Sequence, residues 1–338
     1  MTENEKSQRS RLHGKLPAVL SRRPCPVLSG RLFGTLLPET FRGRFATLLA
    51  VLIGVGLAPQ VGSAPGDRVA ELVRSLPLVA NDDGIELRSD ANLSEPRSVL
   101  AHIKDAYDFD VHLQGWDGIA ELHRPIIVGL ASDKAIEQYV STTMGGRAVG
   151  DSMFASHETI YRDRPDVAWF ITAHELEHLL MHRIGAREPA VPVYIFEGIA
   201  CSLGDRYVRH LGDGGRYFIN ARGKLASYTD VDADDMFKNF RSPADIADAR
   251  TSGTLWRNEH LGGLFFEFLL AGSGKTPAQF FRDFGLLTTD VAKGVSFDDA
   301  FKKRLGGLSL SEQETAFVSF MRDTKGAAAS RFRGTIYE

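Results

Sequence analysis

The sequence predicts an α+β protein in which a small sheet is followed by a mainly helical C-terminal part. Short apolar runs predict strands at 125–130 and 150–161, with a helix at 133–140 between them. A stretch without Gly or Pro predicts one long, largely buried helix at 166–183. Three further segments have helical periodicity and make the C-terminal part mainly helical: 261–271, 297–306 and 310–321.

One folded domain is expected at 65–322, because 43% of the chain is hydrophobic and 25% is charged, as in an ordinary globular protein. Residues 1–44 carry nine Lys or Arg against three Glu, with Pro, Gly and Ser between them, and are expected to form a basic disordered tail. The small, polar segment 323–338 is expected to be a flexible tail.

An apolar run of thirteen residues at 45–57 follows Arg42 and Arg44 and precedes small residues at 62–64. This run is shorter than the roughly 20 residues that span a bilayer, and its surroundings are typical of a secretory signal peptide. We therefore interpret 45–64 as a signal peptide, and expect a secreted, periplasmic or cell-envelope protein. If the segment is not cleaved, it would instead hold the protein at a membrane.

Composition also excludes several classes of function. The net charge of −3 argues against nucleic acid as a partner, since such binding needs a basic surface. The glycine-rich segment 144–150 lacks the strand-to-helix context of a nucleotide site and is expected to be a loop. The segment 212–252 is polar and turn-rich. Its acidic run 230–235 lacks the glycine and terminal glutamate of an EF-hand loop and is expected to be a solvated loop. Cys25 lies before the expected cleavage site, so Cys201 would be alone in the mature chain and no internal disulfide could form.

The segment His174-Glu-Leu-Glu-His178 contains the strongest chemical signal. Residues four apart lie above one another on a helix, so two imidazoles at this spacing can bind one zinc ion, with Glu175 beside them as a base. A catalytic zinc usually has three protein ligands and one water. Glu197, on a second helix predicted at 193–208, supplies the third ligand if the two helices pack as a hairpin. The alternative is a core helix with two hydrogen-bonded histidines.

The spacing of these residues resembles that of the gluzincin metallopeptidases, in which His-Glu-x-x-His is followed by eighteen residues and a Glu. Eighteen residues separate His178 from Glu197 here, and Glu197-Gly-Ile-Ala200 is similar to a segment of bacterial peptidase MA-like domains. The resemblance covers about residues 96 to 322, although only the metal motif is specific. A metzincin would have a third histidine where this chain has Ile184.

The resemblance implies a zincin-like fold: a small mixed sheet whose last strand is an edge strand, then the metal helix, then a helical lobe. It also implies one zinc ion per chain, a peptide or protein substrate, and hydrolysis by a metal-activated water with Glu175 as general base. A Tyr or His on a later helix would stabilise the transition state, and alignment favours His260, with Tyr194 and Tyr228 as alternatives. His260 could equally be a surface histidine at a helix start.

Two positions depart from the pattern. Glu177 occupies a position that is usually uncharged, and we expect it to face a cationic group or the rim of the cleft. Cys201 stands where thermolysin-like enzymes have an aspartate that orients a ligand histidine. These departures support an alternative function, a catalytically inactive, zinc-stabilised binding or scaffold module. The absence of the aminopeptidase Gly-x-Met-Glu-Asn segment favours an endopeptidase.

Overall fold

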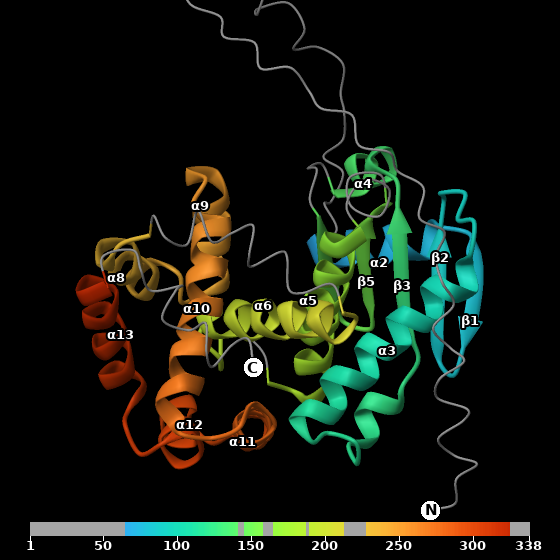
Figure 1. Ribbon diagram of the computed structural model, residues 1–338. Coiled ribbons are helices and arrows are strands. Elements are labelled where there is room, and N and C mark those ends of the chain that lie inside the picture. Colours follow the sequence, from blue (N-terminus) through green and yellow to red (C-terminus); the bar gives the residue numbers. More distant parts are fainter. Residues whose placement is uncertain (1–64, 141–144, 158–164, 187–188, 213–227, 325–338) are drawn as a thin grey trace, which may run out of the picture. The chain divides into compact units, whose positions relative to one another are not determined.

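A computed structural model describes residues 65–140, 145–157, 165–186, 189–212 and 228–324 (Figure 1). The described chain is α+β as predicted, with a five-stranded mixed sheet followed by a mainly helical C-terminal part. Among the described residues, no helix combines the length and apolar character needed to cross a membrane. The expected basic tail, the signal segment and residues 325–338 lie outside the described residues.

The sheet has the strand order β1-β2-β3-β5-β4. β2 pairs parallel with β3 and β3 with β5, while the outer pairs β1–β2 and β4–β5 are antiparallel hairpins. The short turns use backbone that favours glycine, with a positive φ at Gly84 and Gly150. The strands are β1 (Leu78–Asp82), β2 (Ile85–Ser89), β3 (Ile126–Ala131), β4 (Gly146–Val149) and β5 (Ser152–Ser156).

Two predictions about this sheet are wrong. In the described part of the segment expected as a strand at 150–161, the strand is β5, and it is an interior strand rather than the edge. The edge strand is β4, which forms within the segment expected to be a glycine-rich loop. The physical reason is the turn at Gly150, which pairs β4 with the outer edge of β5 and makes β5 an interior strand. Because helices also cover both faces of the sheet, β5 is buried at every position.

Helices cover both faces of the sheet (Figure 1). α2 (Pro65–Ser75) and α4 (Asp133–Val140) pack on one face, where Val73 and Leu76 fit closely over Gly129 of β3. α3 (Pro96–Gln114) and α5 (Pro165–Ile184) pack on the other face, against the main hydrophobic core. The short 3₁₀ helix η1 (Ala120–His123) leads from α3 into β3.

The C-terminal part is organised around α6 (Val193–His210), which packs against α5 on one side and α10 (Leu255–Ser273) on another. The contact between α6 and α10 is close, because a Cβ added to Gly198 would lie 2.6 Å from the backbone of Gly262. The remaining helices complete this part of the fold: α8 (Asp230–Asn239), α9 (Pro243–Ser252), α11 (Pro277–Ala292), α12 (Phe297–Leu305) and α13 (Leu310–Thr324).

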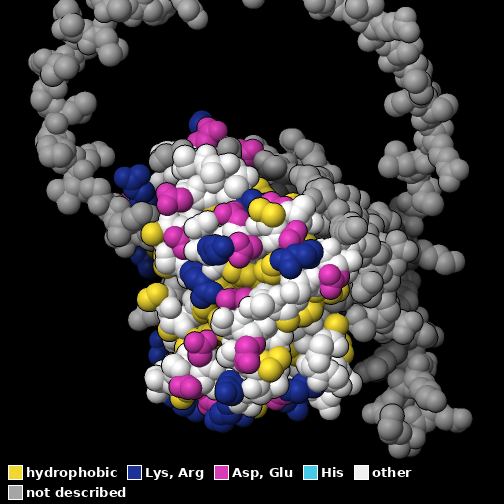
Figure 2. Space-filling view, turned by 90° about the vertical axis from the view of Figure 1, so that its left-hand side faces the viewer, with side chains coloured by type: hydrophobic (Ala, Val, Ile, Leu, Met, Phe, Trp, Pro, Cys, Tyr) yellow, Lys and Arg dark blue, Asp and Glu magenta, His cyan; other side chains and the backbone are white. Residues whose placement is uncertain are grey.

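The acidic run at 230–235 begins a helix, α8, so the prediction of a solvated loop is wrong for this segment. Thr229 and Asp232 form a reciprocal capping box, in which each side chain accepts a hydrogen bond from the other's backbone N–H. The acidic side chains also suit the positive end of a helix dipole. Figure 2 shows acidic and basic side chains mixed on this side of the molecule. Within α8 itself, Lys238 forms an ion pair with Asp234.

Candidate metal centre

The centre is built on α5, which presents His174 and His178 on one face one turn apart. The helix was predicted at 166–183 and spans Pro165–Ile184. It is tightly packed, because Gly204 of α6 lies against the backbone of Phe170, where a Cβ would be only 2.8 Å from the carbonyl oxygen. This approach of α6 to α5 brings a residue from the second helix over the two histidines.

That residue is Glu197, as the spacing predicts. Its Oε2 lies 3.2 Å from Nε2 of His174 and 3.2 Å from Nε2 of His178, and the two nitrogens are 3.0 Å apart. A zinc ion with bonds of about 2.1 Å in tetrahedral geometry would hold its ligand atoms about 3.4 Å from one another. The three atoms therefore already have nearly the spacing of one face of a zinc tetrahedron, and all three residues are buried.

The charge of the group also suits a cation. Burial alone would raise the pKa of Glu197, but the adjacent His178 and His174 outweigh it and hold that pKa below its ordinary value. Glu197 is thus a carboxylate at neutral pH, and two imidazoles with one carboxylate form a donor set typical of catalytic zinc. The described residues can hold a metal ion at this point.

Cys201 contacts the same centre from α6. Its Sγ lies 3.7 Å from Nδ1 of His174, and burial raises the pKa of Cys201 to about 11, so that the group is a thiol. A proton on Nδ1 that points toward this sulfur leaves the lone pair of Nε2 for the metal. Cys201, which the sequence marked only as a departure from the thermolysin-like pattern, therefore contacts one of the metal-binding histidines. Nδ1 of His178 is buried and has no partner among the described side chains and backbone.

Glu175 lies beside the metal-binding group and is 7% exposed. Gly146 of the edge strand packs on its side chain, because a Cβ there would come within 2.9 Å of Glu175 Cγ and of Ile171. Burial raises the pKa of Glu175, and the two neighbouring histidines oppose the shift. A carboxyl group held in this way between metal site and edge strand can accept and return a proton.

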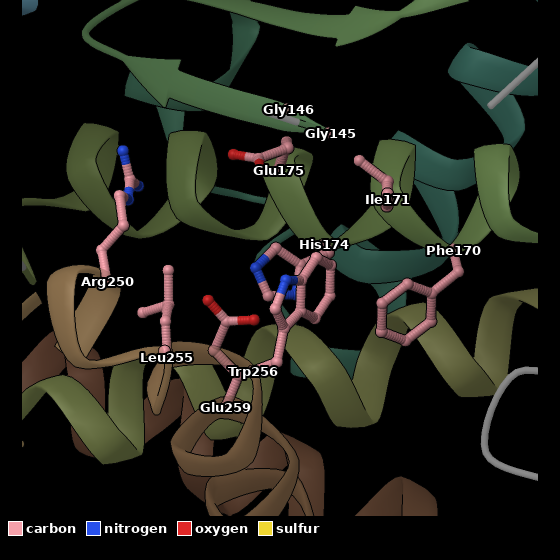
Figure 3. A pocket seen from close by; sticks show the side chains of 11 residues that line it. Gly145, Gly146, Phe170, Ile171, His174, Glu175, Arg250, Leu255, Trp256 and Glu259 are labelled. Carbon is pink, nitrogen blue, oxygen red and sulfur yellow. The ribbon is translucent and has the colours of Figure 1, made fainter. Parts of the chain in front are cut away.

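Two cavities, of about 320 and 660 Å³, meet at His174 and Glu175. The larger runs along β4 and contains all three metal-binding residues. The smaller is lined on one side by α5 and on the other by α9 and α10 (Figure 3). Three residues that sequence reasoning did not single out face this space from α9 and α10: Arg250, Trp256 and Glu259.

His260 is on α10 as predicted, but it does not line either of these cavities. It is buried, and its Nδ1 lies 3.2 Å from the hydroxyl of Tyr228. The preceding residue, Glu259, lines both cavities instead. Tyr194, the other alternative, donates its hydroxyl to Glu314 of α13. A catalytic role for His260 stays a prediction, and the acidic residue next to it is the one that meets the cleft.

Glu177 faces neither a cationic group nor the cleft, so that prediction is wrong. It is fully buried on the side of α5 that turns toward α3, where it accepts a hydrogen bond of 2.7 Å from Gln114 Nε2. Asp110, one turn before Gln114, is also fully buried, and neither of its carboxyl oxygens has a hydrogen-bond partner among the described residues. Burial raises the pKa of Asp110 and of Glu177 well above their ordinary values.

A comparison with models of protein families finds no match for this chain, and neither does a search of curated proteins or of solved structures. The chemistry of the site therefore rests on its own geometry. That geometry is a buried group of His174, His178 and Glu197, on helices that follow a mixed sheet, which is consistent with a zincin-like metal site.

Proposed function

We propose that this protein is a zinc-dependent metallopeptidase that hydrolyses peptide bonds. The observation that supports this most directly is the convergence of two imidazoles and one carboxylate at 3.0 to 3.2 Å, with Glu175 next to them at the junction of two cavities. A buried His₂Glu group with a neighbouring carboxyl and open space in front is the arrangement that metal-assisted hydrolysis requires.

In this hydrolysis, the metal-binding residues, Glu175 and the edge strand would each have a separate role. Zinc, held by His174, His178 and Glu197, would supply an acidified water and polarise the scissile carbonyl. Glu175 would accept the proton of the attacking water at its carboxylate and later donate it to the departing amine. The edge strand β4, which lines the larger cavity, would hold the substrate backbone in an extended conformation by strand addition.

We also propose that the protein acts outside the cytoplasm, because the apolar run at 45–57 follows two arginines and precedes small residues. Cell fractionation with N-terminal sequencing of the mature protein tests this. A new amino terminus near residue 64 in an exported fraction is the expected result, and an intact N-terminus in a soluble cytoplasmic fraction would contradict the proposal.

The first test of the function is the zinc content of the purified full-length chain, by elemental analysis. We expect about one zinc per chain, and less than about a tenth of that in His174→Ala. The matched control is His112→Ala, because the imidazole of His112 is 80% exposed on α3 and lies outside the site. A well-folded chain that takes up no zinc even when it is supplied would overturn the proposal.

The second test separates catalysis from a structural metal. Glu175→Gln should retain zinc and lose at least about a hundredfold in kcat on a peptide library, because the amide cannot take the proton. If Glu175→Gln and the original chain cleave equally well, the assigned mechanism is wrong. If zinc is bound but the original chain cleaves no peptide, the inactive scaffold is the better description.

A further inference from the structure

Trp256 and Glu259 lie three residues apart on α10, so their side chains are neighbours on one face of that helix. Both line the cavity of about 320 Å³, together with Phe170, His174 and Glu175 of the opposite wall. Figure 3 shows the Glu259 carboxylate and the Trp256 indole side by side, close to the His174 ring. An anionic and an aromatic group thus meet next to the metal-binding residues.

The carboxyl group of Glu259 has no hydrogen-bond donor among the described residues and forms no ion pair with a described Lys or Arg. Figure 3 shows the guanidinium of Arg250, which lines the same cavity, directed away from Glu259. A cation that enters the cavity would therefore meet a carboxyl group without a cationic partner, and an adjacent positive charge favours the ionised carboxylate.

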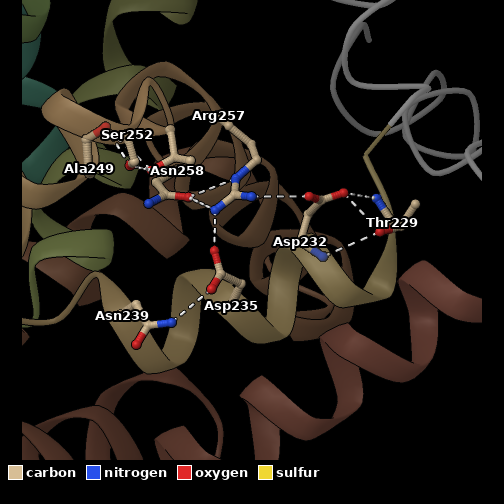
Figure 4. A network of polar contacts seen from close by, with 9 residues as sticks. Thr229, Asp232, Asp235, Asn239, Ala249, Ser252, Arg257 and Asn258 are labelled. Atoms are coloured by element: carbon tan, nitrogen blue, oxygen red, sulfur yellow. Dashed lines mark hydrogen bonds and ion pairs between the residues drawn. The ribbon is translucent and has the colours of Figure 1, made fainter.

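The neighbouring arginine is held away from this carboxylate. Arg257 donates to Asp232 of α8 at 3.2 Å and also pairs with Asp235 (Figure 4). Its guanidinium is further engaged by the side-chain oxygen of Asn258. Arg257 thus lies two positions from Glu259 in the sequence, but its charge is paired with the carboxylates of α8 and not with Glu259.

Trp256 adds a second feature that points to a cation. It is the largest of the exposed hydrophobic side chains in the described part, with 52% of its surface accessible. An indole face is the best aromatic partner for an ammonium group, and carboxylate and indole together form a receptor for such groups. A ligand that covers the indole would explain why so large an apolar side chain as Trp256 is exposed at this cavity.

We propose that Trp256 and Glu259 bind an ammonium group of the substrate, next to the scissile bond. The proposal rests on the proposed peptidase function and specifies its substrates as peptides with a positive charge at this point. An alkylammonium group can come from a free amino terminus or from a lysine side chain. The first source would make the protein an aminopeptidase, and the second would make it a peptidase specific for lysine.

The test uses two pairs of fluorogenic peptides with the zinc-loaded, full-length protein. One pair differs only in a free or acetylated amino terminus, and the other only in Lys or norleucine beside the scissile bond. We expect kcat/KM to favour the charged member of one pair by about tenfold or more. That preference should fall to about one in Glu259→Gln and decrease in Trp256→Leu. Equal cleavage within both pairs, or a preference unchanged in Glu259→Gln, would overturn the proposal.

A measurement without catalysis keeps this test separate from that of the proposed function. The metal-free protein is titrated calorimetrically with n-pentylammonium and with 1-pentanol, which has nearly the same shape and no charge. The amine should bind at least about tenfold more tightly, and Glu259→Gln should abolish the difference. The control is Glu71→Gln, the same change on an exposed residue of α2, across the sheet from the site. If no peptide is cleaved but the amine binds more tightly than the alcohol, the proposed peptidase function is wrong and the proposed ammonium site is supported. If both probes bind with equal affinity, the proposed ammonium site is wrong.

Discussion

The two walls of the cleft are built in different ways. On the α5–α6 wall, the metal-binding residues are 7 to 9% exposed, and glycines let the helix backbones approach until no side chain fits between them. On the α9–α10 wall, Trp256 is 52% exposed and Arg250 is also open to solvent. The start of α10 lacks a side-chain cap and is tied to α8 by the Arg257 ion pairs.

This difference corresponds to two tasks. A metal site needs donor atoms fixed to within a fraction of an ångström, and close-packed helices provide that. A surface that receives a variable ligand instead needs exposed, adaptable side chains. We therefore expect changes on the first wall to alter stability and metal affinity, and changes on the second to alter substrate binding.

The largest effect should come from the point where the walls join. Gly198→Ala would place a Cβ 2.6 Å from the backbone of Gly262, and backbone cannot move aside as a flexible side chain can. We expect a loss of about 3 kcal/mol in the free energy of unfolding, measured with urea, and a reduced zinc content. Gly272→Ala, at an exposed position of α10 with no atom near the new methyl group, is the control and should be neutral or slightly stabilising.

A smaller effect is expected behind the metal helix, at Asp110. Burial raises the pKa of Asp110 well above 3.8 in the folded state. At a pH between the unfolded and the folded pKa, Asp110 is therefore protonated in the folded chain and ionised in the unfolded chain. The stability contributed by this group is therefore complete only below its unfolded pKa, and it decreases as the pH rises toward the folded pKa. Asp110→Asn removes this dependence.

We expect Asp110→Asn to be more stable than the original chain by about 2 kcal/mol at pH 8, with the gap narrowing toward pH 5. Urea unfolding at several pH values measures the gap, and exposed Asp117→Asn is the control. A variant that is less stable than the original at pH 8 would show that the Asp110 carboxylate is ionised and compensated in the fold.

The same contrast explains which parts of the site the sequence could predict. His174 and His178 follow from the 3.6-residue period of one helix, and the hairpin spacing predicted that Glu197 would meet them. The edge strand was missed because the glycines of segment 144–150 predicted a loop, whereas Gly150 forms a turn that pairs β4 with β5. The spacing of residues in the sequence was therefore enough to predict the α5–α6 wall, because its metal-binding residues lie on two consecutive helices.

The facing wall depends on how α10 is rotated about its own axis, and packing far along the chain sets that rotation. One residue corresponds to about 100° on a helix, so the choice between His260 and Glu259 could not be made from the position of the helix alone. The Gly198–Gly262 contact fixes the rotation, and it turns Glu259 toward the cleft and His260 toward Tyr228. Similarly, nothing local to α5 indicates that Glu177 meets Gln114, a residue 63 positions away.

Within the metal wall, a modest effect is expected at Cys201. Cys201→Ala removes the sulfur that lies 3.7 Å from Nδ1 of His174, and residues that orient a ligand in this way typically contribute about tenfold or more to metal affinity. We expect zinc affinity, measured by competition with a chelator, to weaken by about tenfold without loss of fold. Cys201→Ser, which keeps a polar atom there, should weaken it less, and equal affinity in all three proteins would remove Cys201 from the site.

The smallest effect should be at Arg257, on the facing wall. Partly exposed ion pairs contribute little to global stability, so Arg257→Gln should change the free energy of unfolding by less than about 1 kcal/mol and leave zinc content unchanged. Its local effect should be larger, because the start of α10 has no side-chain cap. Amide hydrogen exchange at residues 255–260 should therefore become faster.

Arg322→Gln is the matched control, since Arg322 pairs with Asp230 of the same helix α8 but does not link it to α10. If exchange at 255–260 is accelerated equally in both variants, or in neither, the ion pairs of Arg257 do not hold this wall. Its position would then depend on the α6–α10 packing at Gly198 and Gly262 alone, and the two walls would form one rigid unit.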